Sequence, residues 1–156
     1  YAQLIVIVSG LKETLFDEYE DNSVINVSFA SVDNTNAFSA EESIRDIFMS
    51  GYVPDVVLCL NELNTTCAYQ AVVDYNMVGL VNILGYYDSD TILQAIDHQV
   101  VNATASIDTY QMGELSVNAL EEYNELGYTS QYQPANVTII DSDNVSIYYK
   151  GGADNE

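Results

Sequence analysis

The sequence contains very few basic residues. Its 156 residues include 24 aspartates and glutamates but only three lysines and arginines, which gives a formal net charge of −21. Such a surface repels DNA, RNA and anionic lipid headgroups, so we expect no nucleic-acid contact by this segment and no phosphate or polyanion ligand. We interpret the acidic excess as an aid to solubility rather than as a specific cation site. It fits a secreted or cell-surface protein or a high-salt habitat, and the abundant Tyr, Asn and Ile favour the first.

Cysteines and long apolar runs are also scarce. No apolar run is long enough to cross a membrane, and the basic region of a signal peptide is absent. The only two cysteines, Cys59 and Cys67, lack the C-x-x-C spacing of redox and zinc motifs. We expect both to be buried core thiols, and their spacing leaves a disulfide open. Neither G-x-x-x-x-G-K-[ST] nor G-x-G-x-x-G occurs, which excludes the common nucleotide-binding loops.

Strand and helix patterns alternate along the whole chain. The apolar fraction of 48% excludes disorder, and the length suffices for one domain with a core. Alternation of this kind predicts parallel βαβ units, and therefore an α/β fold with a three-layer parallel sheet flanked by helices. Ser39 and Glu42 form a capping box that predicts a helix start. Expected strands span residues 4–8, 24–29, 56–60, 80–84, 100–106 and 137–140, and expected helices span 12–19, 39–49, 63–75, 90–97 and 111–126.

The third of these strands ends at a polar pair. Residues 56–60 form a continuous apolar run, which is typical of a strand buried on both faces, and Asn61 and Glu62 follow it directly. In open α/β sheets, ligands bind just beyond the carboxyl ends of the strands. The pair therefore predicts a binding site at this edge of the sheet.

Catalytic and metal-binding patterns are weak. His98 is the only histidine, and no Ser, Cys or carboxylate partner lies at a recognisable spacing, so we predict no catalytic residue. Asp141, Asp143 and Asn144 lack the Gly and final Glu of a calcium-binding EF-hand loop, and we interpret them as a turn. We therefore expect no metal, no cofactor and no enzymatic activity, against the alternative of an enzyme on a flavodoxin-like fold.

Four ordered segments carry a resemblance to a known family. They are Pro54–Glu62 with its strand-end Asn, the Gly-Tyr-Tyr-Asp of residues 85–88, the helix end at 96–99 and the segment 103–113 that ends in Tyr-Gln-Met-Gly. In this order the segments resemble the type I periplasmic binding proteins, a sugar-binding family whose fold is shared by the ligand domain of LacI-type regulators. The resemblance implies the carboxyl-terminal lobe of a two-lobed protein. Residues 1–106 would form that lobe, 107–135 a hinge crossing and a helix of the other lobe, and 136–156 a return strand and tail. Most of the other lobe is missing, and we favour a fragment over a reduced version.

The resemblance also implies a set of ligand-binding residues. Asn61 matches the family's strand-end Asn, which hydrogen-bonds sugar hydroxyls. Glu62 stands where the family usually has Asp, and either touches ligand or caps the helix. Phe38 matches an aromatic residue that stacks on the sugar ring, against the alternative of a core Phe. Ser9 ends the first strand at the same edge.

Other positions depart from the family pattern. Tyr87 stands where the family has its ligand-binding Asp, and Asp88 lies next to it. Ile107 replaces a hinge Gln, and Asp108 beside it is a candidate substitute. The first helix is short and lacks the family's Arg, which implies a pocket less basic than a typical ribose or galactose site and leaves a neutral sugar, a cationic small molecule or no ligand open.

The resemblance predicts a solute-binding module, specifically the sugar-binding component of an ABC-type uptake system that closes two lobes around its ligand. The alternative is the ligand-sensing domain of a transcriptional regulator or a membrane signalling protein. The implied partners are a small molecule, with a neutral sugar or polyol favoured, and a membrane permease or signalling protein. We expect an extracytoplasmic location, on the cell surface or in the periplasm, with anchoring in the longer protein. The truncated lobe is also a candidate homodimer, because a helix of the missing lobe would expose an apolar face.

Overall fold

The computed structural model describes residues 11, 13–14, 26–130 and 132–148. The chain divides into two units, Tyr1–Ser31 and Val32–Glu156. In the first unit Leu11, Glu13 and Thr14 are helical, whereas residues 26–31 form neither helix nor strand. The strand expected over 24–29 is therefore wrong for residues 26–29, because a strand exists only through hydrogen bonds to a neighbouring one. The strand expected over 4–8 lies outside the described residues.

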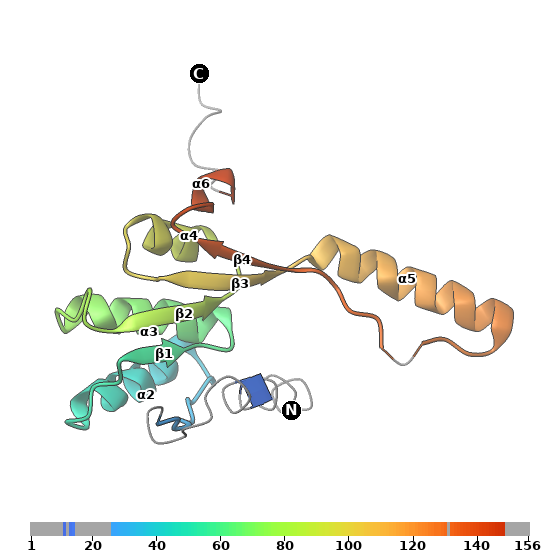
Figure 1. Ribbon diagram of the computed structural model, residues 1–156. Helices are drawn as coiled ribbons and strands as arrows, with labels where there is room; N and C mark the ends of the chain where they lie inside the picture. The colour runs from blue at the N-terminus through green and yellow to red at the C-terminus, as the bar shows by residue number, and fades with distance from the viewer. Residues whose placement is uncertain (1–10, 12, 15–25, 131, 149–156) are drawn as a thin grey trace. The chain divides into compact units, whose positions relative to one another are not determined.

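The second unit is built on a mixed four-stranded sheet. Its strands are β1 (Val56–Leu58), β2 (Asn82–Tyr86), β3 (Ala103–Ile107) and β4 (Val137–Asp141), and they lie side by side in that order (Figure 1). The pairs β1–β2 and β2–β3 are parallel, as the alternation of strands and helices predicts, whereas β3–β4 is antiparallel. The chain leaves the sheet after β3, passes through a long helix and returns as β4. Because β4 runs antiparallel to β3, this last connection is not a crossover that packs a helix on the sheet.

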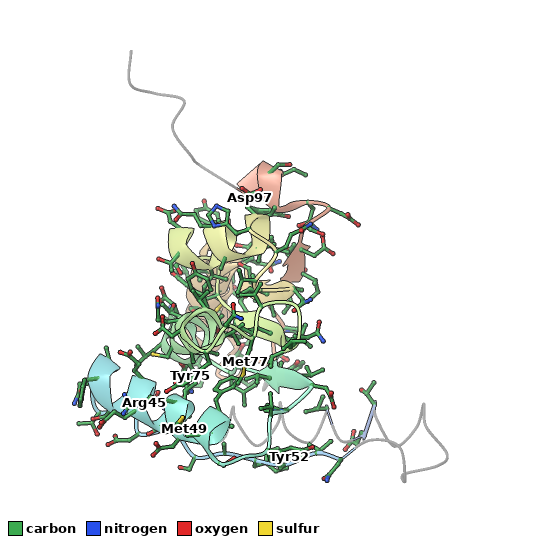
Figure 2. The ribbon with its side chains drawn as sticks, turned by 90° about the vertical axis from the view of Figure 1, so that its left-hand side faces the viewer. Arg45, Met49, Tyr52, Tyr75, Met77 and Asp97 are labelled. Carbon is green, nitrogen blue, oxygen red and sulfur yellow. The ribbon has the colours of Figure 1, made fainter. Side chains whose placement is uncertain are left out.

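Three helices connect or precede the parallel strands. They lie together on one side of the sheet, which Figure 2 shows nearly edge-on. The expected helix over 90–97 agrees with the structure to the residue, and those expected over 39–49, 63–75 and 111–126 agree within two residues at each end. The ends of the helix expected over 12–19 lie outside the described residues. The helices of the unit are α2 (Ala37–Met49), α3 (Glu62–Asp74), α4 (Asp90–Asp97), α5 (Thr109–Leu126) and α6 (Val145–Tyr148).

The core lies between these helices and one face of the sheet. On that face Ile83, Gly85, Thr104 and Ile140 are all buried, and Val57 is half-buried. The helices contribute their apolar stripes, which follow from the helical spacing of their apolar residues. Their fully or nearly fully buried core residues are Ala40, Ile44, Phe48, Cys67, Ala68, Ala71, Val72, Ile92, Leu93, Ala95 and Ile96.

The opposite face of the sheet is apolar and uncovered within the described residues. Val56 is 51% exposed, Leu58 41%, Leu84 38% and Ile139 55%. The expectation that residues 56–60 are buried on both faces is thus wrong for the described part of the chain. The physical reason is the direction of strand addition. The chain adds β2 next to β1 and then β3 next to β2, always moving in one direction across the sheet. Because the crossovers are right-handed, the connecting helices then all lie on the same face of the sheet.

Helix α5 lies apart from this core. None of its residues is buried, although Tyr110, Leu120 and Tyr123 are large apolar side chains. It ends at Gly127, as the sequence predicts, where a φ of 77° favours glycine. The returning segment is tied to α5 at Gln111, whose Oε1 accepts from the backbone N of Asn136 at 2.6 Å.

Within the described residues, no helix is both long enough and apolar enough to cross a membrane.

Candidate functional site

Polar side chains gather where the three parallel strands end. Asn61 follows β1 by three residues, Tyr87 directly follows β2, and Asp108 directly follows β3. Because parallel strands end at the same edge and β2 lies between the other two, Tyr87 and Asp88 lie between Asn61 and Asp108. Edges of this kind are where ligands bind in open α/β sheets.

Asn61 is the N-cap of helix α3. Its side-chain oxygen accepts from the backbone N of Asn64 at 2.7 Å, and its backbone oxygen accepts from the Thr65 hydroxyl at 2.8 Å. The amide NH2 group donates to no other group among the described residues. Asn61 therefore offers a ligand two donors, and its acceptor serves the helix.

The end of β2 has an unusual backbone. Tyr87 has a φ of 84°, in the left-handed region that bulky side chains avoid, and its side chain is 40% exposed. Its N–H donates to the carbonyl of Ala105 at 2.9 Å, and its carbonyl accepts from the Thr104 hydroxyl at 2.7 Å. One residue earlier, the N–H of Tyr86 donates to the Thr65 hydroxyl at 3.0 Å. Neighbouring elements thus fix the strand end on both sides.

Asp108 caps the next helix at this edge. One oxygen of its carboxylate accepts from the backbone N of Gln111 at 2.8 Å, and its own N–H donates to the carbonyl of Asn136 at 3.0 Å. The side chain is exposed, so its second oxygen is accessible from solvent. Ile107 before it is half-buried at the end of β3.

This architecture recurs in solved structures of binding proteins, although no family model and no curated protein matches the sequence. A chain of the XylFII–LytSN complex is 24% identical over 78% of this chain and 43% of its own, with a TM-score of 0.66. An ABC transporter solute-binding protein from Agrobacterium vitis with bound D-fucose is 16% identical over 88% of this chain and 46% of its own, with a TM-score of 0.73. A sugar-binding protein of a sugar ABC transporter from Bacillus halodurans is 20% identical over 90% and 51%, with a TM-score of 0.66.

The chain has the fold of one lobe of the type I periplasmic sugar-binding proteins. The proteins from Agrobacterium vitis and Bacillus halodurans are a solute-binding protein and a sugar-binding protein of ABC transporters. It spans about half of their length or less, from 43% to 51% in the three above. The resemblance stated from the sequence, and its restriction to a partial lobe, are confirmed.

Two further candidate residues lie at helix starts of this lobe. Glu62 is the first residue of α3, and the capping alternative for it is wrong because Asn61 makes the cap. Its exposed carboxylate still complements the positive end of the helix dipole. Phe38 is the second residue of α2 and is 65% exposed, so it is not an ordinary core Phe. Ser9 lies outside the described residues.

The lobe presents acidic and amide groups at this edge rather than cations. Glu62 and Asp90 begin helices there, Asp108 directly follows β3, and Asp88 is the second residue after β2. Arg45 is the one Lys or Arg whose side chain the structure describes, and it pairs with Glu42 at 3.1 Å on the same helix. An anionic ligand would therefore meet repulsion, whereas a neutral polyhydroxylated molecule would meet donors and acceptors.

Elsewhere the described part of the lobe offers little for chemistry. It contains no group of three or more His, Cys, Asp and Glu side chains that could hold a metal ion. His98 is exposed at the end of α4, and residues 142–144 form a turn, as the sequence predicts. Cys59 and Cys67 are both buried free thiols, and burial raises the pKa of Cys59 to about 12. A shallow groove runs along α5, lined by Thr109, Tyr110, Gly113, Glu114, Val117 and Asn118.

Sequence reasoning missed the two threonines that fix the end of β2. Thr65 and Thr104 are 0% and 1% exposed, and both hydroxyls bond to the backbone of residues 86–87. Their only sequence signal is Gly85, because a glycine within a strand indicates a close approach by another group. A Cβ at Gly85 would lie 2.5 Å from Cγ2 of Thr65 and 3.1 Å from Oγ1 of Thr104.

Proposed function

We propose that this chain is one lobe of an extracytoplasmic solute-binding module that holds a neutral sugar or polyol at the carboxyl ends of β1, β2 and β3. The observation that supports it most is the gathering of Asn61, Tyr87, Asp88 and Asp108 at that edge, in a fold shared with sugar-binding proteins. In this proposal the Asn61 amide donates to a ligand hydroxyl, and the carboxylates of Asp88 and Asp108 accept from others.

Aromatic side chains complete the proposed site. Tyr87 offers a stacking face in place of the family's carboxylate, and Phe38 is exposed at the start of α2. Glu62 remains a candidate at the same edge, and Ser9, which lies outside the described residues, remains a candidate from the sequence alone. The site lacks basic side chains among the described residues, which supports a neutral ligand over an acidic one.

The ligand would be enclosed by a second lobe. Helix α5 has no buried residue and exposes Met112, Val117, Leu120 and Tyr123. We propose that residues 107–135 cross to that second lobe and pack there, and that 136–156 return to this one. Closure of two lobes would then bury the ligand and exclude water.

The test is a thermal-shift screen of this lobe together with its second lobe. D-fucose and myo-inositol, which occur in solved structures of similar fold, are tested with glucose, galactose and the acidic control gluconate. A ligand that binds only the folded state adds about 2.7 kcal/mol to the free energy of unfolding at 100 times its Kd, and this raises the melting temperature. A saturable shift for a neutral sugar or polyol supports the proposal. No shift for any neutral compound rejects it.

A second candidate function is ligand sensing through a protein partner, rather than delivery to an ABC-type permease. One of the similar solved structures is a complex of XylFII with LytSN, which supports this alternative. Co-purification of the two-lobed protein with a permease or with a signalling protein, in the presence and absence of sugar, distinguishes the two. Both candidate functions involve binding of the sugar, so either result leaves the ligand proposal intact.

A further inference from the structure

We propose that Thr65 and Thr104 are positioning residues that hold the end of β2 in a left-handed turn and thereby aim the ring of Tyr87 at the ligand. The inference rests on the proposed function and deepens it, because it names the groups that set the shape of the site. It starts from the backbone of Tyr87, whose φ of 84° is unfavourable for an aromatic residue. Such a conformation persists only where the surroundings over-determine it, and such sites cluster at ligand clamps.

The surroundings of Tyr87 do over-determine it. From β3, the Thr104 hydroxyl donates to the Tyr87 carbonyl at 2.7 Å, and the Ala105 carbonyl accepts from the Tyr87 N–H at 2.9 Å. Both polar backbone groups of the residue are therefore bonded to one neighbouring strand. Rotation of Tyr87 to an ordinary negative φ would break at least one of these bonds.

Thr65 fixes the residue before it. Its hydroxyl donates to the Asn61 carbonyl at 2.8 Å and accepts from the Tyr86 N–H at 3.0 Å, so one buried group joins the start of α3 to the end of β2. Asn61 is itself a proposed ligand donor. The same hydroxyl thus couples the position of Asn61 to that of Tyr86 and, through it, Tyr87.

Gly85 allows this close approach. The absence of a side chain lets Thr65 and Thr104 reach the strand from two sides, because a Cβ there would meet both. The result is a rigid strand end that carries a half-exposed ring instead of a carboxylate. A fixed backbone gives the Cα–Cβ bond of Tyr87 one direction and leaves the ring a few rotamers. A ring presented in this way favours ligands with a flat apolar face, and so cyclic sugars and cyclitols over acyclic polyols.

The first experiment needs no ligand. Urea unfolding compares Tyr87→Gly with Tyr87→Ala. Both variants lose the ring, but only glycine adopts a positive φ without steric cost. We expect a higher unfolding midpoint for Tyr87→Gly than for Tyr87→Ala. An equal or lower midpoint would overturn the strained turn. In addition, Thr65→Val should speed amide hydrogen exchange at Tyr86, whereas Thr66→Val, one residue along the same helix, should leave it unchanged.

The second experiment measures binding by calorimetry in the two-lobed protein, well below its melting temperature, with D-fucose, myo-inositol and the acyclic polyol mannitol as probes. Thr104→Val removes the hydroxyl and keeps the shape, and we expect it to weaken binding of the cyclic probes about three- to tenfold. Thr104→Ser keeps the hydroxyl and should bind as the parent does. Thr138→Val, on the neighbouring strand, is the matched control.

The outcomes separate the two proposals. If the parent binds a cyclic probe and Thr104→Val binds it equally well, the positioning role is rejected and the proposed function stands. If Tyr87→Gly retains the full preference for cyclic probes over mannitol, the role of the ring is rejected. If the parent binds none of the probes, the proposed function fails together with the binding part of this inference, and the urea comparison still decides whether the turn is strained.

Discussion

Single uncharged groups decide the geometry of the candidate site at the residue scale. The hydroxyls of Thr65 and Thr104 and the missing side chain of Gly85 fix the end of β2, although the chain as a whole is strongly charged. Buried hydroxyls act over short distances and in fixed directions, because leaving one without a partner is costly in the interior. Substitution at these positions therefore tests the geometry directly.

Gly85→Ala should destabilise the lobe by about 1–3 kcal/mol, because the new Cβ would lie 2.5 Å from Cγ2 of Thr65. Thr65 cannot turn away without losing its hydroxyl bonds to Asn61 and Tyr86. Gly113→Ala is the matched control. It lies within α5 with nothing inside 4 Å of its Cβ position, and helix propensity predicts a gain of up to about 1 kcal/mol. Urea unfolding of both variants gives the comparison, and equal effects would contradict the close approach at Gly85.

The buried thiol of Cys59 predicts a pH dependence. Burial raises the pKa of Cys59 to about 12, and its Sγ donates to the carbonyl of Asn64 at 3.4 Å. The unfolded chain therefore releases this proton near pH 9 while the folded chain keeps it. The thiol's contribution to stability is present below that pH and falls by roughly 1.4 kcal/mol per unit as the pH rises further.

The measurement compares the parent with Cys59→Ala under reducing conditions at pH 7 and pH 10. The difference in free energy of unfolding between the two should shrink by about 1 kcal/mol at the higher pH. Tyrosine ionisation affects both proteins alike and cancels in the difference. A constant difference would show that the thiol is not held neutral in the folded state.

At the scale of elements, helix ends differ from the sequence expectation. Helix α2 begins after Asn36, whose side chain accepts from the backbone N of Ser39 at 3.0 Å. The capping box predicted from Ser39 and Glu42 is therefore wrong. Ser39 lies inside the first turn, and Glu42 pairs with Arg45.

Asn36→Ala should cost about 1 kcal/mol of stability, because it leaves backbone donors of the first turn of α2 without a partner. Ser39→Ala should cost less than about 0.5 kcal/mol, since alanine is a better helix former and the cap stays in place. Thermal unfolding of the two variants distinguishes the two possible caps. A larger loss for Ser39→Ala would restore the capping box.

Helix α5 predicts self-association when the lobe is alone. Its side chains Leu120 and Tyr123 are 69% and 60% exposed, so an isolated lobe leaves them in water. We expect sedimentation at 0.5 M salt to show a concentration-dependent dimer that Leu120→Asp abolishes. Glu121→Gln, on the adjacent acidic side of α5, should dimerise at least as well as the parent. A strictly monomeric parent at high concentration would contradict the prediction.

At the scale of the whole molecule, the net negative charge determines how stability depends on salt. With a net charge of −21, mutual repulsion opposes the compact state, and only three basic residues offer attraction that salt could weaken. Repulsion between exposed charges fades when their separation exceeds the Debye length, which is about 10 Å at 0.1 M salt. Stability should therefore rise with ionic strength.

Raising sodium chloride from 20 mM to 500 mM should raise the melting temperature by roughly 3–6 °C. Calcium chloride at equal ionic strength should have a similar effect, because the described residues contain no cluster suited to a metal ion. A saturable rise at micromolar calcium would instead indicate a specific cation site. Differential scanning calorimetry in the two salts makes the comparison.

The sequence predicted much of the fold, because its signals are local. The apolar runs located β1 to β4, and the amphipathic pattern gave α4 to the residue. Strand starts were less accurate. Residues 80 and 81 were expected in β2, but Leu80 is 71% exposed in the turn after Gly79, whose φ is 79°. Residue type alone does not distinguish an apolar residue in a turn from one in a strand. The start of the strand is defined by its hydrogen bonds to the neighbouring strand, which the local sequence does not show.

The order of strands and helices, the helix end at Gly127 and the polar residues beyond the strands follow from the sequence alone, since each depends on neighbours within a few residues. Only the tertiary structure decided that one face of the sheet is uncovered within the described residues and that Tyr87 is left-handed. These depend on contacts between segments far apart in the chain. The hydroxyl of Thr104 reaches Tyr87 across 17 positions, and no local pattern records that bond.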